Sequence, residues 1–286
     1  MQSMGKNDLE LTIHQVIQKY GLLDNKRHSK SFGQHFLCDF SLLKKIVSCA
    51  LPLENNDIVE VGPGPCGLTR AILEFIGNNK LFCIEKDVTL KPVHDNILAN
   101  SKSNLEFIYD DALKVRPQDL TSKDITIISN LPYNVGTQIL INWLLDLKGI
   151  SKMILMFQKE VADRICATVG TKDYGRLSVI SQLLCKTEKV FNVSNMAFYP
   201  PPKVTSSIIK LTPRNLHIND IAKFEKLTGN CFQHRRKTIF SILKSHYPES
   251  DLDNVLASCE IDKLQRPETI PPEKFLELSL KLDFLK

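Results

Sequence analysis

Short apolar runs and segments with helical spacing alternate along the first half of the chain. Short apolar or β-branched runs, each bounded by polar or turn residues, predict buried strands. These runs are DIVEV (57–61), LFCIE (81–85), LEFIY (105–109), ITIIS (125–129) and KMILMF (152–157). The segments between them, such as LTRAILEFI and TQILINWLLDL, carry apolar residues at helical spacing. Alternating strands and helices predict an α/β fold with a mostly parallel sheet covered on both faces.

The pattern changes after Lys159. Residues 160–169 and 176–187 have helical spacing, whereas TEKVFNV (187–193) and KVTSSIIKL (203–211) alternate as strands that can pair antiparallel at the sheet edge. Beyond Pro213 the periodicity is purely helical, at 218–232, 235–246, 251–259 and 271–285. We therefore predict an N-terminal extension (1–28), an α/β domain (29–213) and a small all-helical domain (214–286).

The composition is that of a soluble globular protein. The chain has 286 residues, of which 43% are hydrophobic, and no apolar run approaches the roughly 20 residues of a membrane span. The N-terminus has no signal-peptide pattern, so a cytosolic protein is expected, by default a monomer. Eight cysteines and seven histidines are scattered without a CxxC or HExxH pattern, so no metal site and no membrane partner is expected.

Basic charge is concentrated in two blocks. Residues 26–45 hold five Lys and Arg against one acid, and residues 203–247 hold nine against two, within a net charge of +5. Such blocks are typical of proteins that bind a phosphate backbone, although a solvated helix face explains either block alone equally well.

A glycine-rich turn, EVGPGPCGLT (60–69), follows the first strand and opens a helix. Glycines in this register let the backbone approach a ligand, and Glu85, at the end of the next strand, can accept hydrogen bonds from both ribose hydroxyls. The pattern predicts an adenosine cofactor, either a dinucleotide or S-adenosylmethionine; a purely structural turn is the alternative. Pro63 and Pro65 remove N–H groups that a pyrophosphate would need, and Asp111 can accept the adenine amine, which favours S-adenosylmethionine.

The segment NLPY (130–133) ends the fourth strand at the same sheet edge. If the substrate is an exocyclic amine such as adenine N6, the Asn130 side-chain oxygen and the Leu131 carbonyl can accept its hydrogens and aim the nitrogen lone pair at a methyl donor. Pro132 fixes the backbone between these acceptors, and Tyr133 offers a flat surface for the base. Positioning in a water-poor pocket would then supply most of the catalysis.

The chain resembles the rRNA adenine N6,N6-dimethyltransferase family, most closely its KsgA/RsmA branch, which dimethylates two adjacent adenosines near the 3′ end of small-subunit rRNA. The resemblance covers residue 29 to the last helix. Its motifs are SFGQHFL (31–37), EVGPGPCGLT, CIEKD (83–87), DDAL (110–113), NLPYNVGTQIL (130–140), FQKEVADRI (157–165), YGRLSVISQ (174–182), FYPPPKVTSSIIKL (198–211) and HRRKTIFSIL (234–243).

The resemblance implies a Rossmann-like S-adenosylmethionine-dependent catalytic domain (29–213), a helical RNA-binding domain (214–286), and a role in small-subunit assembly. The implied cofactor contacts are His35, Leu37, Gly62, Glu85, Asp111 and Asn130. Phe198 would stack on the target adenine opposite Tyr133. His35 stands where many relatives carry Asn.

The RNA must also present an unpaired adenine, because a base that is paired inside a helix cannot place N6 in a pocket. The candidate backbone contacts are Lys203, Arg235, Arg236 and Lys237, with the Lys26–Lys30 cluster, and the expected partner is small-subunit rRNA or the 30S subunit precursor. Three alternatives stay open: an NAD-dependent oxidoreductase, a large-subunit rRNA dimethyltransferase, and a non-catalytic RNA-binding assembly factor.

Overall fold

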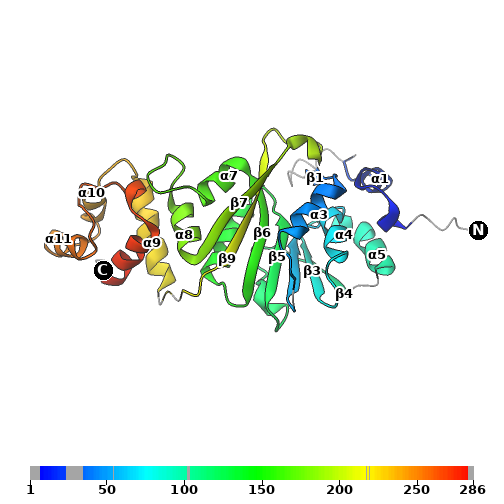
Figure 1. The fold of residues 1–286 in the computed structure, drawn as a ribbon, viewed down its shortest axis with the longest axis horizontal. Helices are drawn as coiled ribbons and strands as arrows, with labels where there is room; N and C mark the ends of the chain where they lie inside the picture. Colours follow the sequence, from blue (N-terminus) through cyan, green and yellow to red (C-terminus); the bar gives the residue numbers. More distant parts are fainter. Residues whose placement is uncertain are drawn as a thin grey trace, which may run out of the picture. The chain divides into compact units, whose positions relative to one another are not determined.

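The structure is a computed structural model that describes residues 7–23, 35–53, 55–101, 104–216, 218 and 220–282, without the side chain of residue 250. Its centre is a seven-stranded mixed sheet of order β4-β3-β2-β5-β6-β9-β7 (Figure 1). The predicted class, a mostly parallel Rossmann-like sheet with an antiparallel edge and additional helices, is confirmed. Among the described residues no helix has the length and apolar character needed to cross a bilayer.

The parallel part of the sheet consists of the five strands that the apolar runs predicted, each within two residues of its expected ends. They are β2 (Asp57–Val61), β3 (Lys80–Glu85), β4 (Asn104–Tyr109), β5 (Ile125–Asn130) and β6 (Ile150–Gln158). Every residue of β2 is buried, as expected for a parallel strand covered on both faces. The carboxyl ends of β2, β3 and β5 therefore meet at one edge of the sheet.

Helices follow these strands as expected. They are α4 (Gly67–Leu73), α5 (Lys91–Asn100) and α6 (Gly136–Leu145), with the short turns η2 (Val88–Leu90) and η3 (Pro117–Asp119). Helix α3 (Phe40–Ser48) packs against α4. Helix α3 was not predicted from the sequence, although Asp39 caps it through its side chain, 3.0 Å from the Leu42 N–H.

The antiparallel edge is also present. Strand β9 (Ser206–Pro213) pairs antiparallel with β6, with Gln158 opposite Ser206, and β7 (Cys185–Val193) forms the outer edge. Helices α7 (Lys159–Ile165) and α8 (Arg176–Leu184) precede these strands.

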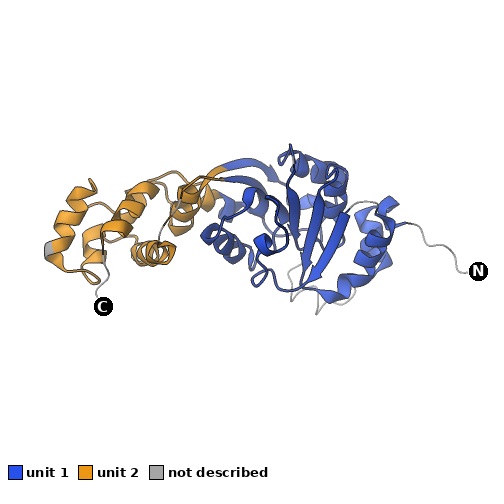
Figure 2. Cartoon of the chain, turned by 90° about the horizontal axis from the view of Figure 1, so that it is seen from below, with its two compact units in different colours: residues 1–162, 188–212 blue, residues 163–187, 213–286 orange. Residues whose placement is uncertain are grey.

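The chain divides into two compact units (Figure 2), residues 1–162 with 188–212, and residues 163–187 with 213–286. The second unit contains α9 (Ile221–Gln233), α10 (Ile239–Leu243), α11 (Glu249–Ser258), α12 (Pro272–Lys281) and η5 (Pro267–Thr269). Helix α8 belongs to it because α8 packs against α9 and α12, whereas the sequence pattern assigned residues 163–187 to the first domain. The helix predicted at 235–246 is shorter, since Thr238 caps a new start at Ile239.

The N-terminal segment packs on the first unit. It forms η1 (Asp8–Glu10) and α1 (Ile13–Lys19), and Val16 is fully buried in the core of that unit. Arg70 on α4 donates hydrogen bonds to the Leu9 and Leu11 carbonyl oxygens, both at 2.8 Å. Residues 7–23 are therefore part of the fold rather than an appendage.

Farther along the chain, β1 (Phe36–Leu37) and β8 (Phe198–Tyr199) form a two-stranded antiparallel ribbon. The short helix η4 (Asn195–Ala197) precedes β8.

Arg70→Met should lower the free energy of unfolding by about 2 kcal/mol, because it removes two charge-assisted hydrogen bonds to backbone carbonyls while keeping the side-chain length. Chemical denaturation measures the change. Arg116→Met is the matched control, since the Arg116 side chain is 60% exposed and pairs with the surface carboxylates of Asp119 and Asp146, which contribute little. Equal effects from both variants would contradict a structural role for the N-terminal segment.

Candidate functional site

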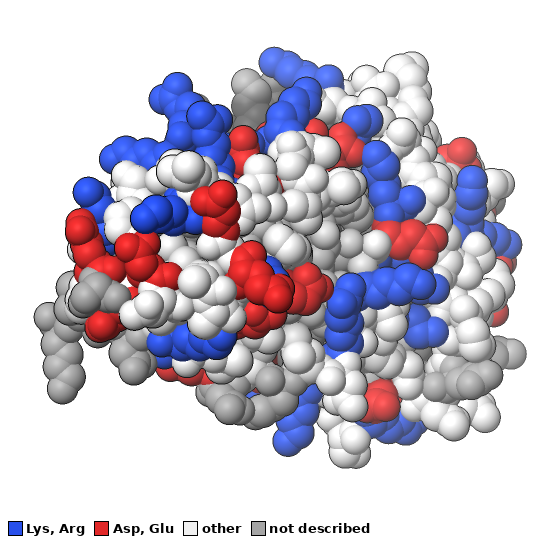
Figure 3. All heavy atoms as spheres, turned by 60° about the vertical axis from the view of Figure 1, so that its left-hand side comes forward, with Lys and Arg blue, Asp and Glu red and all other residues white. Residues whose placement is uncertain are grey.

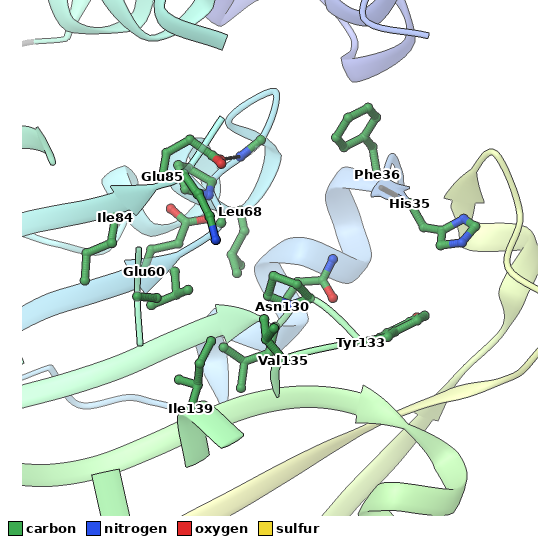
Figure 4. A pocket seen from close by; sticks show the side chains of 18 of the residues that line it. His35, Phe36, Glu60, Leu68, Ile84, Glu85, Asn130, Tyr133, Val135 and Ile139 are labelled. Carbon is green, nitrogen blue, oxygen red and sulfur yellow. Dashed lines mark hydrogen bonds between the residues drawn. The ribbon is translucent and has the colours of Figure 1, made fainter. Parts of the chain in front are cut away.

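A cavity of about 270 Å³ opens at the carboxyl ends of β2, β3 and β5. Its wall comes from the ends of these strands, the glycine-rich turn, the 110–112 segment and residues 35–37. Figure 4 shows Glu60 and Glu85 on one side of the cavity, and Asn130, Tyr133 and His35 on the other. This is the edge at which α/β sheets bind ligands.

The glycine-rich turn forms the floor of the cavity. Gly62 and Gly64 have left-handed φ angles of +69° and +54°, which favour glycine. A Cβ on Gly64 would also lie 3.2 Å from the Phe36 ring. The Gly62 N–H donates to the Ile84 carbonyl oxygen at 2.9 Å, which ties the turn to β3. At Gly62 and Gly64 the backbone therefore faces the cavity without a side chain in between, beside Pro63 and Pro65.

Glu85 closes the turn from the end of β3. Its carboxylate accepts hydrogen bonds from the Gly64 N–H at 3.2 Å and the Asp87 N–H at 2.9 Å. The side chain lines the cavity, and burial raises its pKa. Because each carboxylate oxygen can accept more than one hydrogen bond, Glu85 keeps acceptor capacity for two hydroxyl groups of a ligand.

Glu60 is a site residue that the sequence analysis missed. It is 1% exposed and lines the cavity, where it accepts hydrogen bonds from the Thr69 hydroxyl at 2.7 Å and the Cys83 thiol at 3.5 Å. Burial, with the nearby Glu85 charge, raises its pKa to about 8. The carboxyl is therefore mainly protonated near pH 7. The available signal was an acid between two valines near the end of a predicted strand.

Asp111 lines the cavity beside Asp110 and Ala112. Its carboxylate bonds to the Lys86 ammonium at 2.7 Å and the Leu113 N–H at 3.0 Å, and the hydrogen bond from Lys86 lowers its pKa. Asp111 is therefore a fixed anionic acceptor, and Lys86 is a second site residue absent from the predicted set.

The four residues of NLPY adopt a tight turn between β5 and α6. Asn130 ends β5 and lines the cavity, and its side chain has no hydrogen-bond partner within the described part of the chain. Leu131 is 1% exposed. The Pro132 carbonyl oxygen accepts the Gly136 N–H at 2.8 Å, which closes the turn onto α6. The Asn130 amide is thus available to a ligand.

Two aromatic rings stand beside this turn. Tyr133 is fixed by a 2.6 Å hydrogen bond between its hydroxyl and the Ser206 hydroxyl. The His35 ring lies nearly parallel to it, 6.1 Å away at 30°, and is held 2.8 Å from the Pro200 carbonyl oxygen through Nδ1. Leu37, the other predicted residue of this segment, also lines the cavity. The rings and the Asn130 amide bound one side of the same space (Figure 4).

Phe198 does not form the predicted clamp with Tyr133 in this structure. It is 4% exposed, packs in the core with Leu37 and Leu43, and is absent from the cavity wall. Side chains alternate along a strand, so β8 sends Phe198 inward and Tyr199 outward.

The predicted RNA contacts separate into two kinds. Arg235 is engaged within the second unit, with Nη2 2.7 Å from the Glu268 carboxylate and Nη1 3.0 Å from the Lys172 carbonyl oxygen. Lys203, Arg236 and Lys237 are exposed, and the Lys26–Lys30 cluster lies outside the described residues. On the face shown in Figure 3, groups of basic and acidic side chains are interspersed rather than separated.

Within the described ranges no group of three or more His, Cys, Asp and Glu side chains could hold a metal ion. The cavity instead offers a glycine backbone, buried carboxyls, an amide and a ring. Together with the mixed sheet, these features define a Rossmann-like methyltransferase.

Comparison with known proteins gives the family. The family model "Ribosomal RNA adenine dimethylase" matches residues 25–283. The chain is 43% identical over 273 residues to "Ribosomal RNA small subunit methyltransferase A" of Agrobacterium fabrum, covering 93% of this chain and 96% of that one. It is 39% identical to the protein of the same name from Rhodospirillum rubrum, covering 95% and 92%. The chain belongs to the ribosomal RNA adenine dimethylase family.

Solved structures agree with this assignment. A dimethyladenosine transferase from Plasmodium falciparum superposes with a TM-score of 0.70 at 27% identity, covering 85% of this chain and 96% of that one. The 23S rRNA methyltransferase ErmE superposes with a TM-score of 0.64 at 25% identity, covering 86% and 99%. The predicted resemblance is confirmed, and the oxidoreductase alternative is excluded.

Glu60→Gln should flatten the pH dependence of stability. In the wild type the folded state keeps the Glu60 proton up to about pH 8, whereas the unfolded state loses it near its ordinary pKa of about 4.3. Stability from this group is therefore complete at low pH and is lost between these values, by at most about 1.4 kcal/mol per pH unit. Denaturation from pH 5 to 9 measures the difference between the two proteins. A difference that does not change with pH would contradict a protonated Glu60.

Proposed function

We propose that this protein uses S-adenosylmethionine to dimethylate N6 of two adjacent adenosines in a loop near the 3′ end of small-subunit (16S) rRNA. It acts as a cytoplasmic monomer on the 30S subunit precursor and so contributes to subunit assembly. The observation that carries the proposal is the Asn130 amide, which lies beside the Tyr133 ring in the cavity that Glu85 also lines.

The cavity suits the cofactor of this class of methyltransferases. Glu85 has acceptor capacity for the ribose hydroxyls, and Asp111 can accept the adenine amine. Gly62, with no side chain to block approach, together with Leu37 and the backbone of His35, would contact the remainder of the cofactor. The negative charge of the Asp111 carboxylate also suits a sulfonium cation, because opposite charges attract.

The bound cofactor supplies an electrophilic methyl group. The protein's own residues prepare the acceptor: the Asn130 oxygen and the Leu131 carbonyl accept the two N6 hydrogens in the first transfer and the one that remains in the second, and Pro132 fixes the backbone beside them. This arrangement weakens the overlap between the nitrogen lone pair and the purine ring. The nitrogen becomes acidic once it has taken the methyl group, and it then releases a proton to solvent. Tyr133 supports one face of the base, and its hydroxyl is already held by Ser206, so its ring is preorganised.

Phe198 stays a predicted residue of this site, and its buried position supports a different contribution. Its ring packs behind Leu37, so it holds the 35–37 segment against the cavity. The flat contact to the base then comes from Tyr133.

The choice of RNA rests on overall likeness. The relatives named as small-subunit methyltransferases are 38–43% identical to the chain, whereas the 23S rRNA methyltransferase ErmE is 25% identical.

Purified protein with labelled S-adenosylmethionine should transfer label to undermethylated small subunits and not to large-subunit rRNA. Mapping should place dimethyladenosine at two adjacent positions. Label found only in large-subunit rRNA would overturn the substrate assignment, and no transfer to any RNA would overturn the activity.

Asn130→Ala should lower the methyl-transfer rate in this assay by roughly 100-fold or more, because it removes a preorganised acceptor from the reacting nitrogen. Calorimetry should still show cofactor binding if the amide acts mainly on the base. Tyr133→Phe, which keeps the ring and loses the Ser206 hydrogen bond, should lower the rate by less, because the ring still supports the base. Near-normal turnover by the Asn130 variant would contradict the proposed chemistry.

Arg236→Ala should weaken RNA binding and reduce the slope of log affinity against log salt by about 0.7–0.9, the contribution of one phosphate contact. Arg235→Ala should instead lower the stability of the protein, because Arg235 already bonds to Glu268 and Lys172. Binding titrations at several salt concentrations, with thermal unfolding in parallel, separate the two effects. An unchanged salt slope for Arg236→Ala would remove this residue from the RNA contacts.

A further inference from the structure

Large apolar side chains are exposed on the loop that carries β8. We call residues 196–204 the β8 loop. Met196 is 79% exposed, Tyr199 43% and Val204 44%, and Lys203 is exposed between them. Exposing three apolar side chains within nine residues to water is unfavourable, and such clusters are typical of binding surfaces.

The β8 loop is held in place at several points. The Cys38 N–H donates to the Ala197 carbonyl oxygen at 3.0 Å, and the Asn195 amide donates to the Pro202 carbonyl oxygen at 3.2 Å. His35 Nδ1 donates to the Pro200 carbonyl oxygen at 2.8 Å. The exposure therefore belongs to a fixed conformation, and a ligand would meet a preorganised surface.

Strand pairing puts this surface next to the cavity. Tyr199 lies directly opposite Phe36, and Phe36 lines the cavity wall. The Tyr199 ring also packs at 5.1 Å and 54° against the His14 ring of α1. This contact fixes the orientation of the tyrosine ring and leaves part of it in solvent. An aromatic surface thus stands one strand away from the pocket that is proposed to hold the target adenine.

The charge of this region indicates the class of partner. Residues 194–205, which carry the β8 loop, contain Lys203 and no Asp or Glu. Exposed aromatic and thioether side chains beside a cation, with no acid in the same segment, suit a ligand that has flat bases and a phosphate backbone.

We propose that the β8 loop binds the nucleotide next to the target adenosine, with its base stacked on Tyr199 beside Met196 and its phosphate near Lys203. The inference deepens the proposed function and rests on it. When one of two adjacent adenosines is in the cavity, its neighbour emerges at the rim, where the β8 loop supports it. A single strand is thus held in an extended form that keeps the target base out of its stack.

The test uses the full-length protein and a fluorescently labelled RNA hairpin whose loop carries two adjacent adenosines. A second hairpin replaces one of these adenosines with an abasic nucleotide. Tyr199→Ala should weaken binding of the intact hairpin roughly 5-fold or more, as expected for the loss of one base–aromatic stack. The same variant should bind the singly abasic hairpin as the wild type does, because the stacked base is already missing.

Two variants serve as controls. Tyr199→Phe keeps the ring and should bind within about 2-fold of the wild type. Phe75→Ala removes a comparably exposed aromatic ring, 37% exposed, just beyond the end of α4, and should leave RNA binding unchanged. Calorimetry should give the same cofactor affinity for Tyr199→Ala and the wild type.

The outcomes separate the inference from the proposed function. Equal weakening of both hairpins would mean that Tyr199 acts by supporting the ribbon, and no weakening would mean that it does not stack; either result overturns the inference. A loss of cofactor affinity would also overturn it, because the effect would then pass through Phe36. Methyl transfer by the wild type to small subunits tests the proposed function independently of all three results.

Discussion

The backbone of Gly64 is held at its N–H and at its carbonyl oxygen, and the geometry of the cavity depends on these two contacts. Its N–H donates to Glu85 at 3.2 Å, and its carbonyl oxygen lies 2.9 Å from Nε2 of His94, a fully buried residue of α5. His94 in turn accepts from the Tyr109 hydroxyl at 2.9 Å and stacks on Phe107 with the rings 4.3 Å apart. Burial lowers the pKa of His94 to about 4, so the ring stays neutral with Nε2 as donor. A left-handed turn with unfavourable conformational entropy is thereby fixed in one conformation.

This restraint connects the Glu85 side of the cavity with two strands and a helix. Glu85 ends β3, His94 lies on the following helix, and Tyr109 ends β4, so the position of the turn follows from the register of the sheet. On the opposite side, Asn130 and Tyr133 are placed by the end of β5 and by Ser206 at the start of β9. Both sides of the cavity are built on rigid elements. The proposed chemistry therefore needs no large movement of an acidic or basic side chain.

The predictable parts of this structure were those determined by local pattern. Apolar runs located the parallel strands, and the glycine spacing located the tight turn that lines the cavity, because a tight turn depends on consecutive residues. Long-range packing was less accessible. The inward position of Phe198 depends on pairing with Leu37, more than 150 residues earlier, and the engagement of Arg235 depends on Glu268. The Glu60 carboxyl was missed because nothing in a single strand indicates that Thr69 will bond to it.

The packing around Gly67 has a consequence for the N-terminal helix. A Cβ at this position would lie 3.2 Å from the Leu37 carbonyl oxygen, 3.3 Å from Leu43 and 3.4 Å from Ile13, so α1, α3 and the 35–37 segment converge on the first residue of α4. A molecule that fills the cavity and binds only the native state shifts the opening equilibrium of everything packed on that turn. The amide protons of residues 13–19 therefore become reporters of cavity occupancy, although none of these residues lines the cavity.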